Sequence, residues 1–200
     1  AERSGFIADL GYETYQKILK EAVEELKNDE FSDLYYGADS DTKPEEFVSE
    51  CTIESDLEIL FPANYVPQES ERISLYQELD MERETDIRQF CERLEDRFGR
   101  IPHEAMELIR VVRLRRLAKQ LGIEKVGLKQ GYMYLYFVSD EHVAYYQSAA
   151  FGRILGFLQK NPKLCKLREI NGRRSLAIKD ITSVESAVSV LEEVLQTLPV

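Results

Sequence analysis

The chain has 200 residues, which fits one domain or one domain with a short additional segment. Its 44% hydrophobic and 32% charged residues are typical of a soluble globular protein, and no apolar run reaches the roughly 18–20 residues of a membrane helix. The net charge of −11 argues against a protein that mainly binds phosphate backbones, because such binding needs clustered Lys and Arg. It therefore favours a protein partner and no membrane.

Three cysteines, Cys51, Cys91 and Cys165, are too widely spaced for a disulfide framework or a CxxC metal site. They predict reduced thiols and a cytoplasmic location. The amino terminus has neither an initiator Met nor the apolar segment of a signal peptide, so we expect the sequence to begin inside a longer protein.

An amphipathic helix is predicted at about residues 9–27, where apolar residues recur at helical spacing. These residues are Tyr15, Ile18, Leu19, Ala22, Val23 and Leu26. The next segment, 28–50, holds eight acids and one Lys, with turn-forming residues and no apolar period. Low hydrophobicity and like-charge repulsion predict an extended acidic linker there.

A strand is predicted near residues 52–60, which are rich in β-formers and end before Pro62. Three helices are expected after it, at about 68–80, 82–97 and 103–121. Gly99 and Gly122 supply the carboxyl-terminal signals of the second and third helix.

Two hairpins are predicted in the second half of the chain. Residues 123–138 form the first, with a turn around Gln130–Gly131, and its second strand should be central in the sheet. Asn171–Gly172 supplies the two positive-φ residues of a type I′ turn in the other hairpin. A helix near 148–160 lies between them, and a last helix, 183–197, should begin at a capping box of Thr182 and Glu185.

This order of elements predicts an α+β fold with a small, mostly antiparallel sheet covered by helices. A long amphipathic helix and an acidic linker precede it. Within this fold the sequence contains no catalytic motif: the closest approach to a phosphate loop, Gly122 to Gly127, has Leu128 where Lys is needed, and it precedes a strand. His103 and His142 are 39 residues apart. We therefore expect no enzyme activity, cofactor or metal in this chain.

A basic hairpin at 160–179 is the remaining candidate site, because it holds seven bases and one acid. Its candidate nucleic-acid contacts are Lys166, Arg168, Arg173 and Arg174. Against this interpretation, the hairpin lacks the interleaved aromatic residues of proteins that bind single strands, and its bases can instead meet the acidic half of the chain.

Two segments match a known family pattern. Residues 61–76 place Pro62, Tyr65, Pro67, Arg72, Leu75 and Tyr76 in an order of proline, aromatic, proline, Arg-Leu and Tyr, and Arg97-Phe98-Gly99 is followed by Pro102. With these motifs the chain resembles the C-terminal portion of the bacterial transcription-repair coupling factors, which are large DNA-translocating ATPases.

The resemblance implies three parts: residues 1–27 as the tail helix of an upstream motor lobe, 28–50 as a linker, and 51–200 as the family's C-terminal domain. In that family the domain is not catalytic, and ATP and Mg belong to the motor of the parent protein. It packs on an amino-terminal UvrB-like module, masks the surface that recruits UvrA and restrains the motor until RNA polymerase is engaged. RNA polymerase and DNA are contacted by other domains of the parent.

The resemblance also implies an acidic clamp in the helix that ends at Arg-Phe-Gly. Asp96 matches one family acid, whereas Arg93 stands at the position of the other, and Glu92 or Glu95 can compensate on the same helix face. An internal ion pair between Asp96 and Arg100 is the alternative role. A nucleic-acid-binding accessory domain that uses the basic hairpin is the alternative function.

Overall fold

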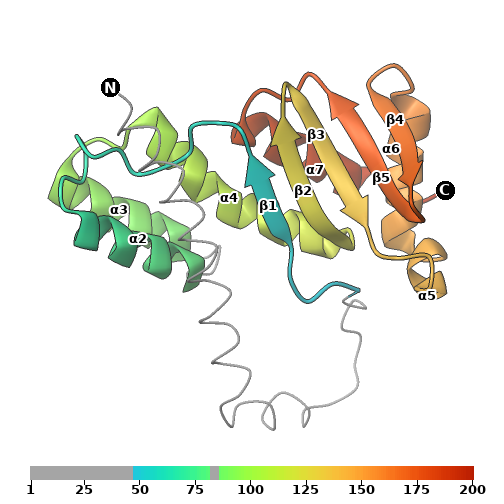
Figure 1. The fold of residues 1–200 in the computed structure, drawn as a ribbon, viewed down its shortest axis with the longest axis horizontal. Helices are drawn as coiled ribbons and strands as arrows, with labels where there is room; N and C mark the ends of the chain where they lie inside the picture. The colour runs from blue at the N-terminus through green and yellow to red at the C-terminus, as the bar shows by residue number, and fades with distance from the viewer. Residues whose placement is uncertain (1–46, 82–85) are drawn as a thin grey trace, which may run out of the picture. The chain divides into compact units, whose positions relative to one another are not determined.

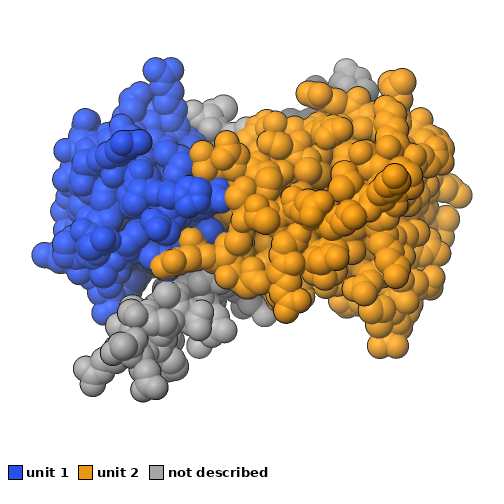
Figure 2. Space-filling model, turned by 90° about the horizontal axis from the view of Figure 1, so that it is seen from above, with its two compact units in different colours: residues 1–44, 59–109 blue, residues 45–58, 110–200 orange. Residues whose placement is uncertain are grey.

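The computed structural model describes residues 47–81 and 86–200 (Figure 1). The predicted helix at about 9–27 and most of the predicted linker at 28–50 lie outside the described residues. The chain divides into two compact units (Figure 2). Among the described residues, unit 1 comprises 59–109 and unit 2 comprises 47–58 together with 110–200.

Unit 1 contains α2 (Glu69–Met81), α3 (Ile87–Phe98) and the first turns of α4 (His103–Gln120). The bounds of α2 and α4 confirm the predicted helices to within one residue. The predicted start of the next helix, residue 82, lies outside the described residues; the described helix α3 begins at Ile87, after Asp86. Its end is confirmed, since Gly99 adopts a φ of 84° and its N–H donates to the carbonyl of Glu95.

Unit 2 contains a five-stranded sheet in the order β1-β2-β3-β5-β4. The strands are β1 (Thr52–Ser55), β2 (Ile123–Lys129), β3 (Tyr132–Phe137), β4 (Cys165–Ile170) and β5 (Arg173–Lys179). β1 pairs with β2 in parallel and every other pairing is antiparallel, so the α+β class and the central place of β3 are confirmed.

β1 is shorter than predicted, because the chain turns away directly after Ser55. The hydroxyl of Ser55 accepts a hydrogen bond from the Leu57 N–H at 3.0 Å, and the predicted strand to residue 60 was wrong beyond this turn. The two hairpin turns are confirmed. Gln130 and Gly131 have φ values of 53° and 78°, and Asn171 and Gly172 have values of 53° and 74°.

Unit 2 also contains α5 (Val143–Tyr146), α6 (Ala149–Lys160) and α7 (Val184–Gln196). In Figure 1 the sheet lies in front of α6 and α7, which cover one of its faces. The side chains directed to that face alternate along the strands and are at most 1% exposed: Met133, Leu135, Phe137, Leu176 and Ile178. These residues form the core of the unit.

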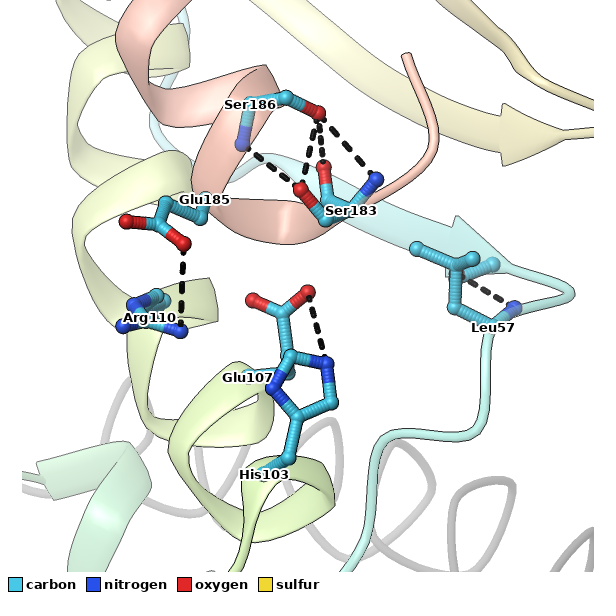
Figure 3. Close-up of polar contacts among 8 residues, drawn as sticks. Leu57, His103, Glu107, Arg110, Ser183, Glu185 and Ser186 are labelled. Carbon is cyan, nitrogen blue, oxygen red and sulfur yellow. Dashed lines mark hydrogen bonds and ion pairs between the residues drawn. The ribbon is translucent and has the colours of Figure 1, made fainter.

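The amino-terminal cap of α7 differs from the prediction (Figure 3). The cap residue is Ser183 instead of Thr182, and its hydroxyl accepts from the Ser186 N–H at 3.0 Å while the Ser186 hydroxyl accepts from the Ser183 N–H at 3.2 Å. A serine hydroxyl at the third helical position thus replaces the carboxylate that we had assigned to Glu185. Glu185 instead lies 4.0 Å from Arg110.

Candidate protein-interaction surface

The family-like residues of unit 1 anchor the loop that precedes α2. The Tyr65 hydroxyl donates to the carbonyl of Gly99 at 2.7 Å, and Arg72 Nη1 donates to the carbonyls of Val66 and Pro67 at 2.8 and 3.0 Å. These side chains satisfy backbone groups of irregular chain that has no strand or helix partner. Their role in this unit is therefore structural.

A third anchor is buried. The Phe61 N–H donates to the Tyr76 hydroxyl at 3.1 Å, and the two rings pack with their centroids 5.1 Å apart. Burial raises the pKa of Tyr76 despite this hydrogen bond, so the phenol stays protonated. Sequence reasoning found these residues only through the family pattern, because no local period links residue 61 to residue 76.

α3 presents two different charged sides. Phe90 and Leu94 are buried along its centre. On one side Arg93 forms an ion pair with Glu78 of α2, and Arg97 Nη2 lies 2.6 Å from the carboxylate of Glu71. Arg93, which stands at the position of a family acid, is therefore engaged within unit 1.

The other side of α3 carries the three predicted clamp acids. Glu92, Glu95 and Asp96 are all exposed, and their spacing of three and four residues places them together on one helix face. Glu92 lies 3.2 Å from Arg88 in a well-solvated i,i+4 pair. Within the part of the chain that the structure describes, Asp96 forms no ion pair with Arg100.

The predicted basic hairpin does not form one surface. The register of β4 and β5 directs Lys166, Arg168 and Arg173 to one face of the sheet and Arg174 to the opposite face. Arg174 Nε lies 3.3 Å from the carboxylate of Asp140, and its guanidinium lies 4.8 Å from the ring centroid of Tyr146. The structure thus separates Arg174 from the other three candidate contacts.

The thiols and histidines do not assemble into a reactive group. Cys51, Cys91 and Cys165 are free, and burial raises the pKa of Cys51 to about 12 and that of Cys165 to about 11. His103 Nε2 lies 4.0 Å from the Glu107 carboxylate (Figure 3). Residues 47–81 and 86–200 contain no cluster of His, Cys, Asp and Glu suited to a metal, and no helix there is long and apolar enough to cross a membrane.

Comparison with known proteins agrees with the motifs and the fold. Residues 55–148 match the family model of the TRCF domain. This segment is therefore similar to a TRCF domain. The chain is 29% identical over 168 residues to the transcription-repair-coupling factor of Escherichia coli K12 and 28% identical over 130 residues to that of Bacillus subtilis. It aligns over 83% and 63% of its own length, but it spans only 13% and 10% of these relatives.

A solved structure supports the fold of the TRCF domain. The crystal structure of a C-terminal domain of transcription-repair coupling factor superimposes with a TM-score of 0.58, covering 74% of this chain and 94% of that domain at 16% identity. The resemblance inferred from the sequence motifs is confirmed. The helices and mixed sheet described above therefore have the same fold as that domain.

Proposed function

We propose that residues 51–200 form a non-catalytic regulatory domain of a DNA-translocating repair ATPase in the cytoplasm. In this proposal the domain binds an amino-terminal UvrB-like module of the same protein, masks the surface that recruits UvrA and restrains the motor. ATP, Mg, RNA polymerase and the DNA on which the motor acts are bound by other parts of the parent. The observation that carries the proposal is the exposed acidic face of α3, formed by Glu92, Glu95 and Asp96.

The distribution of charge on α3 supports a protein partner for this face. The bases on the side next to α2 already face Glu71 and Glu78, whereas the acids on the far side extend into solvent. An exposed acidic face attracts a basic surface and repels phosphate. Among the described residues Glu95 and Asp96 form no ion pair, whereas Glu92 pairs with Arg88; Asp96 also stands at the position of a family acid, so we assign it the main contact.

Charge reversal tests this assignment. Asp96→Lys in the full-length protein should raise basal ATPase activity and UvrA recruitment, because loss of a charge pair at a partly buried interface costs about 2–5 kcal/mol. A closed state favoured by a few kcal/mol would then open. Binding of the 200-residue chain to the separate amino-terminal module should weaken by at least about tenfold.

Glu141→Lys is the matched control, since Glu141 is also an exposed acid but lies in unit 2. It should leave ATPase activity and recruitment at the wild-type level. Unchanged values in Asp96→Lys would remove this residue from the restraint. Unchanged values after deletion of residues 51–200 would overturn the proposed function of the whole domain.

A further inference from the structure

One face of the sheet in unit 2 is covered by no helix among the described residues. In Figure 1, α6 and α7 lie behind the sheet, and the uncovered face of the sheet is turned toward the viewer. β3 directs Tyr132, Tyr134 and Tyr136 to this open face, since its other residues, Met133 and Leu135, point into the core. Three tyrosines therefore form a column along the central strand.

Strand pairing sets each tyrosine in a row with residues of the neighbouring strands. The rows are Lys129–Tyr132–Lys179, Gly127–Tyr134–Ala177–Lys166 and Lys125–Tyr136–Ser175–Arg168. Basic residues thus lie on both sides of the tyrosine column. Small residues stand directly beside Tyr134, which leaves its ring room to lie over the sheet.

The rings of this face contact one another and a flanking lysine, and Tyr132 is exposed. Tyr132 and Tyr134 lie with their planes 24° apart and their centroids separated by 5.9 Å, and Tyr132 is 41% exposed. The Lys125 ammonium lies 5.1 Å from the ring centroid of Tyr136. Aromatic rings grouped on an uncovered sheet face provide a surface on which a flat ligand can stack.

The charge of the face is opposite to that of the whole chain. Six bases lie on it, namely Lys125, Lys129, Lys166, Arg168, Arg173 and Lys179, against the two acids Glu54 and Glu124. Glu54 lies within 3.3 Å of Lys125 and Lys129, and Glu124 lies 4.0 Å from Arg173. Within the described part of the chain, Lys166, Arg168 and Lys179 form no ion pair.

We propose that this face binds single-stranded DNA. Its nucleobases stack on the tyrosine column, and its phosphates contact the flanking Lys and Arg side chains of β2, β4 and β5. Aromatic rings within a positively charged surface bind an unpaired strand without sequence preference, because every base has a face that stacks. A duplex hides those faces. The choice of DNA over RNA rests on the proposed repair function. The surface lies in unit 2 and the clamp acids lie in unit 1, so the two proposals fail separately.

Fluorescence anisotropy with an oligothymidine of about 15 nucleotides tests the proposal on the 200-residue chain. Tyr132→Ala should weaken binding roughly five- to a hundredfold, because it removes a stacking ring. Tyr132→Phe should bind within about twofold of the wild type, since stacking needs the ring and not the hydroxyl. Thermal unfolding of both variants establishes that each is folded.

A second pair of variants remains decisive if Tyr132→Ala does not fold. Arg168→Gln and Arg174→Gln remove the same charge from the same hairpin, but only Arg168 lies on the open face. Arg168→Gln should lower the slope of log K against log salt by about 0.7, the value for one lost phosphate contact, and Arg174→Gln should not.

Three results would overturn the proposal: no binding at about 50 mM salt, tighter binding of duplex DNA or of RNA of the same length, or an equal effect of the two arginine variants. Loss of DNA binding with the clamp intact would leave the proposed regulatory function in place. Loss of the clamp with DNA binding intact would do the reverse.

Discussion

Unit 1 and unit 2 position the residues of their exposed surfaces through different interactions. In unit 1 the side chains of Tyr65, Arg72 and Tyr76 bind single backbone groups, at the end of α3 and in the loop before α2. In unit 2 the tyrosine column and its flanking bases are placed by strand register over a closely packed core. Unit 1 should therefore be sensitive to loss of a polar anchor, and unit 2 to changes in backbone and packing.

The two surfaces also differ in sign. The net charge of −11 suggests an acidic surface throughout, but the open face of the sheet has six basic residues against two acidic ones. A net charge describes the chain as a whole and not the surface that a partner meets. The difference shows that an acidic composition does not exclude a local phosphate-binding surface.

The largest expected effect concerns packing in unit 2. Gly122 has a φ of 69°, and a Cβ there would overlap the ring of Tyr145, whose hydroxyl donates to the buried carbonyl of Leu121 at 2.8 Å. Gly122→Ala should lower the free energy of unfolding by about 2–5 kcal/mol, combining left-handed strain with overpacking. Urea denaturation measures it.

Gly131→Ala is the matched control, because Gly131 has a φ of 78° with open space around it. It should cost only about 1–2 kcal/mol, the strain alone. An equal loss of unfolding free energy in the two variants would mean that overlap with the Tyr145 ring adds nothing to the cost of Gly122→Ala.

A smaller effect tests the polar anchors of unit 1. Tyr76→Phe keeps the ring but removes the acceptor of the buried Phe61 N–H, so the free energy of unfolding should fall by about 1–3 kcal/mol. Tyr134→Phe, in the open sheet face of unit 2, should change it by less than about 0.5 kcal/mol. Urea denaturation measures the free energy of unfolding of both variants. An unchanged value for Tyr76→Phe would contradict the proposal that unit 1 depends on its polar anchors.

The smallest effect is electrostatic and belongs to the sheet of unit 2. Burial alone would raise the pKa of Glu54, but the hydrogen bonds and charges of Lys125 and Lys129 outweigh it and lower that pKa below its ordinary value of 4.5. A lowered carboxyl pKa stabilises the fold above pH 4.5, and this stabilisation is lost as the pH falls through the folded-state value.

Unfolding of the wild type and of Glu54→Gln at pH 7 and pH 3 measures this contribution. The wild type should lose slightly more stability than the variant over that interval, by a small amount because the carboxylate is largely solvated. An identical loss in both proteins would show that the two lysines do not stabilise the charged form of Glu54.

Local sequence signals predicted most elements of the two units and few of their contacts. The hairpin turns at Gln130–Gly131 and Asn171–Gly172 and the ends of α2 and α4 depend on residues only a few positions apart, so the sequence sufficed. The cap of α7 was misassigned because Thr182 and Ser183 carry equally suitable hydroxyls. Only the folded chain shows which one accepts from the helix.

The alternation of Tyr132, Tyr134 and Tyr136 with apolar neighbours and the basic character of residues 160–179 could be read directly from the sequence. Tertiary structure alone decided that β5 pairs with β3, which brings these aromatic and basic residues onto one face, and that Arg174 turns to the other. The physical reason is that the period of a strand depends on its own backbone. Its neighbours and its covered face depend on the packing of residues far apart in the chain.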